Sequence, residues 1–379
     1  MSLNLQGHVA PGFEPVRDEF VANFSRQDVF QEVGAALAVY RGTELVVDLW
    51  AGVANLQTGE PWTDQTLANV WSTTKGVAAI AVAVLVDRGL LDYAAPVARY
   101  WPEFAQQGKG QITVSQLLSH QAGLPGFVEP TSLDDFYDWP AIIGRLERQA
   151  PMWPPGTQNS YHAMTFGFLA GELVRRASGM SVGQFLASQI AGPLGADVYI
   201  GLPMALEGQV APLIGPRREA PFDLDAMAPS AIAAISNPAM EPLIPNDRAW
   251  RAAEVPAGNG HATALGLAKL YGAVANGGAL DGVRIMGPQT VAAMSTTQTR
   301  RVDLMLGVAP HWRNGFAGNE SGLFGPHPHV FGHSGWGGSF GCADTKAGVS
   351  IGYVMNQMGD GIVGDPRATA LCNRIYSCL

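Results

Sequence analysis

The chain has 379 residues, of which 47% are hydrophobic and 15% charged, so it can bury a substantial core in one large domain or two lobes. Its 23 basic and 32 acidic residues give a net charge of −9 and form no basic cluster, which argues against a nucleic-acid partner. The apolar run at residues 77–86 is too short to span a bilayer, and we expect no membrane partner.

The N-terminal part of the chain predicts a helix, a hairpin and a buried helix. Hydrophobic residues at helical spacing predict an amphipathic helix over residues 16–24. Two apolar segments, residues 35–40 and 45–50, predict strands joined as a hairpin. Residues 77–86 are apolar on every side and therefore predict a helix buried in the core, which ends near Gly89.

The middle of the chain is predicted to be mostly helical, and strands return near the C-terminus. Candidate helices lie at residues 114–120, 139–149, 165–178 and 182–190. Candidate strands lie at residues 329–333, 339–343 and 349–355. This order predicts an α+β fold, with one α/β lobe built from residues 1–92 and 263–379 and a mostly helical lobe, residues 93–262, inserted between them.

The segment Ser72-Thr73-Thr74-Lys75 directly precedes the predicted buried helix. Ser72 would lie at the helix N-terminus, where free N–H groups and the helix dipole favour developing negative charge. Residues three apart share a helix face, so Lys75 would lie beside the Ser72 hydroxyl, and a desolvated lysine can take a serine proton. The pattern indicates an activated nucleophile; the alternative is a helix-capping serine with Lys75 reaching to solvent.

A second candidate is Tyr161, which a Pro-Gly turn at residues 155–156 delivers just before the predicted helix at residues 165–178. A charged Lys75 nearby would stabilise the phenolate and lower the pKa of Tyr161, which makes this residue a candidate general base. The alternative is a core tyrosine whose hydroxyl bonds to the backbone.

Residues 332–339 form a third, glycine-rich segment, Gly-His-Ser-Gly-Trp-Gly-Gly-Ser. Glycines let a substrate approach a strand edge, where backbone N–H groups can donate to an oxyanion; the alternative is an ordinary hairpin. Residues 337–341 also match G-x-S-x-G, the nucleophile motif of α/β-hydrolases. No histidine follows Ser339 to act as its general base, so we expect Ser339 on the strand that carries the oxyanion donor.

In this order the three segments resemble the serine β-lactamase and penicillin-recognising superfamily, and most closely its esterase branch, the family VIII carboxylesterases. Further matches within residues 15–358 are Leu91-Asp92, Pro96, the segments 100–104, 112–114, 117–120 and 123–125, Gly277-Gly278 and the segment 352–356. The resemblance implies a β-lactamase/transpeptidase-like fold, an antiparallel sheet flanked by helices, with the active site between the lobes. It also implies Ser72 as the acylated nucleophile and Lys75 with Tyr161 as the proton-transfer pair. The N–H groups of Ser72 and Trp336 would form the oxyanion hole.

Two positions depart from the lactamase pattern. Ala163 stands two residues after Tyr161, where lactamases carry asparagine. His333-Ser334-Gly335 replaces the Lys-Thr-Gly triad, so the fixed cation that would hold a β-lactam carboxylate is missing. A neutral His333 suits uncharged esters better. Both departures favour an esterase, whose substrate would contact His333, Gly335, Trp336 and Gly337.

Neither a cofactor nor a metal is expected. His327, His329 and His333 lie close in sequence, but no carboxylate or thiolate follows at zinc-site spacing, and we place these histidines in a loop by the active-site mouth. His120 and His162 are expected to be structural. Cys342, Cys372 and Cys378 form no C-x-x-C pair, and with no signal-peptide pattern at the N-terminus they favour reduced thiols in the cytoplasm.

The function expected is a serine esterase that hydrolyses small short-acyl or aryl esters through an acyl-enzyme on Ser72. The alternatives are a β-lactamase, a peptidase acting on D-amino acids or an acyltransferase of the same fold, and a non-catalytic binding protein that keeps this fold. Aromatic residues are candidates for the walls of the cleft: Phe136, Tyr137, Trp139, Trp153 and Trp336. The oligomeric state is left open.

Overall fold

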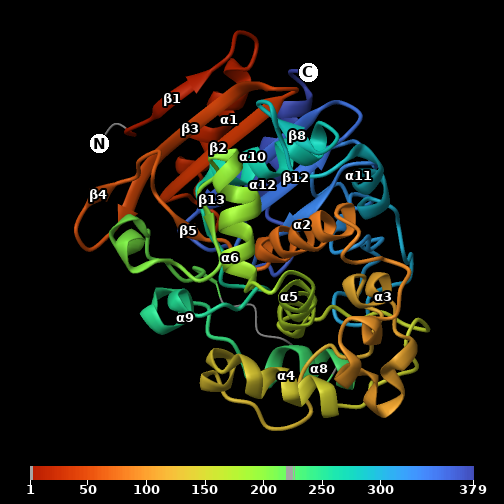
Figure 1. Ribbon diagram of the computed structural model, residues 1–379. Helices are drawn as coiled ribbons and strands as arrows, with labels where there is room; N and C mark the ends of the chain where they lie inside the picture. The colour runs from red at the N-terminus through yellow and green to blue at the C-terminus, as the bar shows by residue number, and fades with distance from the viewer. Residues whose placement is uncertain (1–2, 219–224, 226) are drawn as a thin grey trace.

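An antiparallel sheet of eight strands forms the centre of the molecule, in a computed structural model that describes residues 3–218, 225 and 227–379. The strand order is β1 (Gln6–Val9), β3 (Glu44–Asn55), β2 (Gly34–Arg41), β13 (Val349–Met355), β12 (Phe340–Asp344), β11 (Phe331–Ser334) and β10 (Ala317–Gly318), and β4 (Glu60–Pro61) pairs with β3. Strands from the two ends of the chain meet where β2 pairs with β13 (Figure 1). The sheet is therefore built from both ends of the chain.

Helices cover both faces of this sheet. Gly341 on β12 faces Tyr271 of helix α10 (Ala264–Ala275), so closely that a side chain at Gly341 would collide with the tyrosine ring. The neighbouring residue, Cys342, points the other way and interacts with Cys372 of helix α12 (Pro366–Tyr376). Helix α1 (Glu14–Phe24) packs against α12. The sheet is thus the middle of three layers.

Helix α2 (Thr73–Asp87) lies between the sheet and the helical part of the chain (Figure 1). Its residues from Thr73 to Leu85 are all buried, because it contacts strand β11 as well as helices α5 (Thr165–Ser178) and α6 (Val182–Leu186). An apolar sequence on every side of the helix is what this position requires. Helix α2 therefore packs against the sheet on one side and against helices α5 and α6 on another.

The remaining elements are short. The helices are α3 (Val114–Leu118), α4 (Trp139–Arg148), α7 (Gly192–Leu194), α8 (Pro229–Ser236), α9 (Arg248–Ala252) and α11 (Pro288–Met294). Short 3-10 helices lie at Val97–Arg99, Pro102–Gln111, Asp134–Tyr137, Met204–Gln209 and Ile244–Asn246. Two small sheets consist of β5 (Ala68–Asn69), β7 (His261–Ala262) and β6 (Val198–Tyr199), and of β8 (Ala279–Leu280) with β9 (Val283–Arg284).

Most of the predicted elements are confirmed, including the N-terminal helix, the hairpin, the buried helix and the three C-terminal strands. The predicted helix at residues 182–190 changes at Leu186 into a π-helical turn, Ala187–Ala191, which no periodicity signals. Helix α10 has no counterpart among the predicted elements. The division into lobes at residues 93 and 262 remains a prediction.

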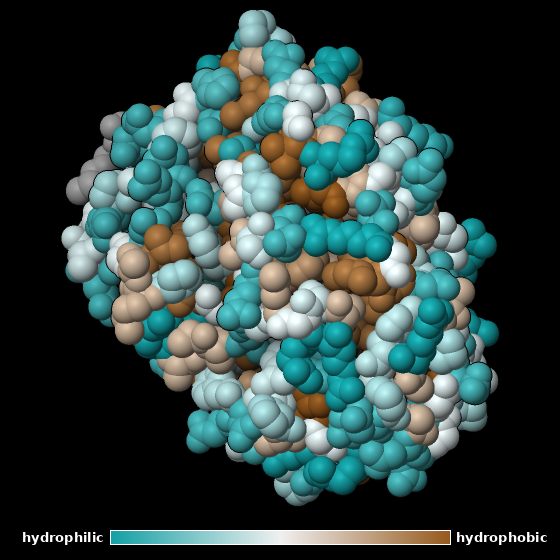
Figure 2. Space-filling view, in the orientation of Figure 1, coloured by the Kyte–Doolittle hydropathy of each residue, from teal (hydrophilic) through white to brown (hydrophobic). Residues whose placement is uncertain are grey.

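Hydrophilic residues cover much of the surface that Figure 2 shows, and the hydrophobic ones gather in separate areas between them. Among the helices at residues 3–218 and 227–379, none has the length and apolar character needed to cross a membrane.

Candidate active site

Ser72 caps the N-terminus of α2, directly after a residue in an unusual conformation. Trp71 has a φ of 42°, a left-handed value that costs energy for a large side chain. Asn69 stabilises it by accepting the Trp71 N–H at 3.0 Å, and the indole ring of Trp71 packs between those of Trp250 and Trp336. This sharp bend leaves the Ser72 hydroxyl exposed to a cleft at the start of the helix.

Lys75 lies one turn into α2, where the sequence predicts it, with its amine beside the serine. Its Nζ is 2.9 Å from Ser72 Oγ and 2.9 Å from the carbonyl oxygen of Ala257, and the side chain is fully buried. Burial without a carboxylate partner holds the pKa of Lys75 well below the usual 10.5. Lys75 therefore does not reach to solvent, and its lowered pKa favours the neutral amine.

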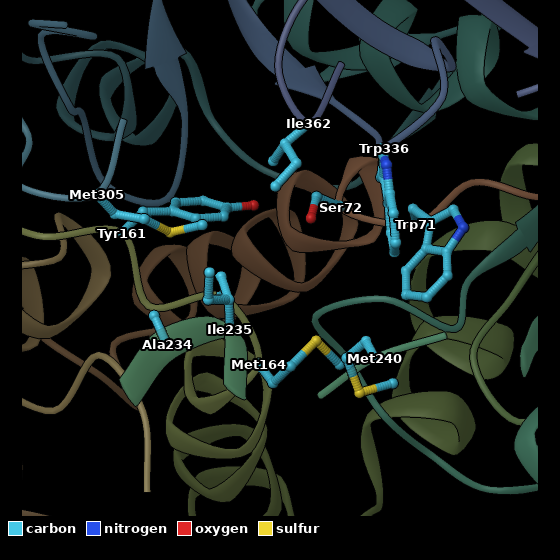
Figure 3. Close-up of a pocket in the computed structure, with 11 residues that line it drawn as sticks. Trp71, Ser72, Tyr161, Met164, Ala234, Ile235, Met240, Met305, Trp336 and Ile362 are labelled. Carbon is cyan, nitrogen blue, oxygen red and sulfur yellow. The ribbon is translucent and has the colours of Figure 1, made fainter. Parts of the chain in front are cut away.

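Tyr161 also faces the Ser72 hydroxyl (Figure 3). Its ring lies 4.7 Å from Lys75 Nζ, and its phenol oxygen points towards Ser72 (Figure 3). The expectation of a lowered pKa is wrong. Burial raises the pKa of Tyr161, the Ser72 hydroxyl offsets only part of this effect, and the depressed pKa of Lys75 removes the cation that was to stabilise a phenolate. The tyrosine therefore keeps its proton at neutral pH.

Asp303 positions Tyr161, and the sequence gives no motif for it. Its carboxylate is fully buried, and Oδ1 accepts the Tyr161 backbone N–H at 2.9 Å. Oδ2 accepts the indole N–H of Trp312 at 2.9 Å and the side-chain amide of Asn159 at 3.2 Å. Trp312 in turn stacks on the Tyr161 ring, with the ring planes 11° apart. One carboxylate thus fixes both the backbone and the ring of the tyrosine.

The glycine-rich segment reaches the site as the turn between β11 and β12. Within the described chain, the backbone N–H groups of Gly335, Gly337 and Gly338 all donate to carbonyl groups, whereas those of Trp336 and Ser72 have no acceptor. Two free N–H groups at the cleft are what a tetrahedral oxyanion needs. The turn brings Trp336 against Trp71, whose ring centroid is 5.1 Å away.

Ser339 is not a nucleophile. It lies just before β12, it is buried, and its hydroxyl donates to the carbonyl oxygen of Val70 at 2.9 Å. Thr73 contributes a second bond between the same segments, from its hydroxyl to the Ser339 carbonyl at 3.2 Å. These bonds attach the turn that carries Trp336 to the start of α2.

His333, at the end of β11, is neutral. Its Nδ1 lies 2.9 Å from the carbonyl oxygen of Ser334, so Nδ1 carries the proton. Burial lowers its pKa to about 3. Position 333 therefore carries no positive charge at neutral pH, whereas the lysine of the lactamase pattern would carry one.

Apolar side chains from segments far apart in sequence line the cleft at Ser72, which has a volume of about 520 Å³ and is open to solvent. They are Trp71, Ala163, Met164, Ala234, Ile235, Met240, Met305, Trp336 and Ile362 (Figure 3). Apart from Trp336, the aromatic residues expected here lie elsewhere. Phe136, Tyr137 and Trp139 line another cavity, and Trp153 packs against His162.

A second, larger hollow of about 1200 Å³ adjoins this cleft and shares Met305 and Ile362 with it. Its walls include His333, Ser334 and Trp312, and Asp360 is the charged residue among them. The cleft at Ser72 therefore continues into a second hollow of mixed polarity.

The other histidines have structural contacts. His120 accepts the backbone N–H of His162 at 3.0 Å, and His162 accepts that of Leu124 at 3.2 Å, as expected of structural residues. His327 and His329 do not lie by the mouth of the cleft. They precede β11 at the end of the β11–β12 hairpin that is opposite to Trp336.

Comparison with known proteins shows the family to which the chain belongs. A family model described as Beta-lactamase matches residues 21–371. The chain is 37% identical to Esterase/beta-lactamase LipL of Mycobacterium tuberculosis over 346 residues, 86% of this chain and 77% of that protein. A family VIII carboxylesterase superposes with a TM-score of 0.94 at 48% identity, covering 99% of this chain and 100% of its own. A penicillin-binding protein homologue from Caulobacter crescentus gives the same TM-score at 42% identity, again over 99% and 100% of the two chains. The chain therefore belongs to the beta-lactamase family and is a serine hydrolase with the architecture of a family VIII carboxylesterase.

Proposed function

We propose that the protein is a carboxylesterase that hydrolyses small, uncharged esters through an acyl-enzyme on Ser72. The observation that carries the proposal is the contact of 2.9 Å between Ser72 Oγ and the buried amine of Lys75, at the edge of an apolar cleft. Burial lowers the pKa of this amine well below its usual value, which favours the neutral form that can take the serine proton.

In the first half of the reaction, Ser72 Oγ attacks the ester carbonyl carbon while its proton moves to Lys75 Nζ. The carbonyl oxygen becomes an oxyanion that accepts hydrogen bonds from the N–H groups of Ser72 and Trp336. The new ammonium is stabilised by the carbonyl oxygen of Ala257 and by the face of the Tyr161 ring.

Collapse of this intermediate breaks the bond to the alcohol oxygen. The Tyr161 phenol gives its proton to the leaving alkoxide and regains one from the Lys75 ammonium. A raised pKa for the phenol supports this role as proton donor. In the second half, water attacks the acyl carbon while its proton passes to the same pair of residues. The bond from the acyl carbon to Ser72 Oγ then breaks, the pair returns the proton to Oγ, and the acid leaves.

The electrostatics of the cleft support an uncharged substrate. Its lining residues carry no charge, His333 is neutral, and Asp360 in the adjoining hollow is paired with Arg218, so no unpaired cation among these residues would hold an anion. The apolar lining of the cleft supports a short acyl or aryl group beside the serine, and the adjoining hollow supports a bulkier alcohol further away.

The test is hydrolysis of p-nitrophenyl esters with acyl chains of two to twelve carbons by the wild type and by the Ser72→Ala variant. We expect turnover to be greatest for the short chains and to be lost in the variant. A variant that keeps most of the activity would refute Ser72 as nucleophile, and a maximum at ten or more carbons would refute the preference for small esters.

The alternatives share the acyl-enzyme and differ in the acceptor or the acyl donor. Ala163 and neutral His333 disfavour a β-lactamase, and nitrocefin turnover tests that activity directly. D-amino-acid amides test a peptidase, and an ester with excess alcohol tests acyl transfer. A fluorophosphonate that leaves Ser72 unlabelled would favour a non-catalytic binding protein.

We also propose that the protein works in the cytoplasm and without nucleic-acid or membrane partners. Its three cysteines are free, which suits a reducing compartment. The net charge of −9 disfavours polyanions.

A further inference from the structure

In the folded protein, a carboxylate lies beside two histidines that have no carboxylate at zinc-site spacing in the sequence. His327 and His329 precede β11, and Asp344 is the last residue of β12. His327 Nδ1 lies 3.0 Å from Asp344 Oδ2, and His329 Nε2 lies 2.8 Å from Oδ1. One nitrogen from each histidine and one carboxylate oxygen lie within 4.8 Å of one another. Sequence spacing hides this cluster, because the pairing of β11 with β12 creates it.

These atoms suit a divalent transition-metal ion. Imidazole nitrogens and a carboxylate oxygen are zinc ligands, and three protein ligands leave a fourth position for water. Bonds of about 2.0–2.1 Å at tetrahedral angles place neighbouring ligand atoms roughly 3.3 Å apart. The two nitrogen–oxygen separations found here are only a few tenths of an ångström shorter, so an ion could enter with small side-chain shifts.

The carboxylate already has the supporting contacts that metal ligands require. Oδ1 accepts the backbone N–H groups of Lys346 and Ala347, and Oδ2 accepts the hydroxyl of Tyr376 at 3.1 Å. Such outer contacts orient a ligating carboxylate. Asp344 is fully buried, and within the described residues its ion-pair partners are the two histidines, with no lysine or arginine. A buried carboxylate without a fixed cation favours a bound one.

The cluster is also accessible to an ion from solution. The side chains of His327 and His329 are 43% and 27% exposed, which leaves a path for the ion and room for its water. We propose that His327, His329 and Asp344 bind a divalent transition-metal ion, zinc by the nature of its ligands. The ion connects the segment before β11 to the end of β12 and, through Tyr376, to α12. Its place at the far end of the hairpin from Trp336 makes it a stabilising ion and not part of the catalytic step.

The test is zinc binding by chelator-treated protein, measured by isothermal titration calorimetry and by metal analysis after dialysis. We expect one ion per chain and a higher melting temperature with zinc than without. The His327→Ala and His329→Ala variants should each weaken binding about tenfold or more, and cobalt(II) should give visible d–d bands in the wild type that the variants lack.

His311→Ala is the matched control, because His311 is also a partly exposed histidine paired with one carboxylate, Glu320 at 2.7 Å, outside the cluster. It should bind zinc as the wild type does. Ester hydrolysis by each variant reports whether it has folded. Equal binding by the wild type and both cluster variants, or no stoichiometric binding by the wild type, would overturn the proposal and leave an ion-free hydrogen-bonded cluster.

Discussion

Replacing Tyr161 by phenylalanine removes one buried oxygen and leaves the ring in place. The residue is 1% exposed, and among the described residues its hydroxyl has no hydrogen-bond partner. An unpaired buried polar group costs about 1–3 kcal/mol. Because the Ser72 hydroxyl faces the phenol, we take the low end and expect the free energy of unfolding to rise by about 1 kcal/mol. In a chain of this size, that corresponds to an increase of about 1 °C in melting temperature.

The same substitution should nearly abolish catalysis. Phenylalanine cannot give a proton to the leaving alkoxide, and a positioned acid or base contributes about 100- to 10,000-fold to the rate. This loss equals roughly 3–5 kcal/mol of activation free energy. The assay is kcat for p-nitrophenyl acetate beside denaturation by urea, each measured on the wild type and the Tyr161→Phe variant.

Tyr93→Phe is the matched control. Tyr93 is buried, its hydroxyl also has no partner among the described residues, and it lies beyond the C-terminal end of α2, away from Ser72. It should give a similar gain in stability with unchanged kcat. If Tyr161→Phe kept kcat within a few fold of the wild type, the phenol would not be the proton donor. If it lowered stability, the hydroxyl would have a partner that the geometry does not show.

Three further predictions follow from the site. Because burial lowers the pKa of Lys75, kcat/KM should rise with pH well below pH 10.5, as this amine loses its proton. A pH profile of kcat/KM that rises only near pH 10.5 would contradict a buried base. At pH values between the pKa of Lys75 in the folded chain and its pKa in the unfolded chain, the unfolded chain binds one more proton. The free energy of unfolding therefore rises with pH in this range, and urea titrations of the Lys75→Met variant should show a flatter dependence on pH. The Asp303→Asn variant should lower kcat about 10- to 100-fold with little change in KM, because it misplaces Tyr161 without touching the substrate. An effect on KM alone would refute the positioning role of Asp303. Gly335→Ala would place its Cβ 2.2 Å from the Val70 carbonyl oxygen, and displacing the Trp336 N–H should lower kcat about 100-fold; steady-state kinetics at wild-type level would show that this N–H is not needed.

Local patterns were sufficient to predict the elements that carry the site. The contact of Ser72 with Lys75 depends on helical spacing and on an apolar helix, both of which are visible in ten to fifteen residues of sequence. The turn that carries Trp336 follows from its glycines in the same way. These are short-range properties, and the structure agrees with them.

Features made by long-range packing could not be predicted. Asp303 reaches Tyr161 across 142 residues of chain, and the cleft residues Met164, Ile235 and Ile362 meet only in the folded protein. The protonation of Lys75 depends on how deeply it is buried, which sequence spacing does not determine. For that reason the predicted shift in the pKa of Tyr161 had the wrong sign.

Peptide mapping after reaction with diethyl p-nitrophenyl phosphate tests the central claim most directly. If a neutral Lys75 deprotonates Ser72, a single adduct should form on the peptide that contains Ser72, and Lys75→Met should suppress it while the protein stays folded. Labelling of another serine in the wild type, or equally fast labelling of Ser72 without Lys75, would contradict the account.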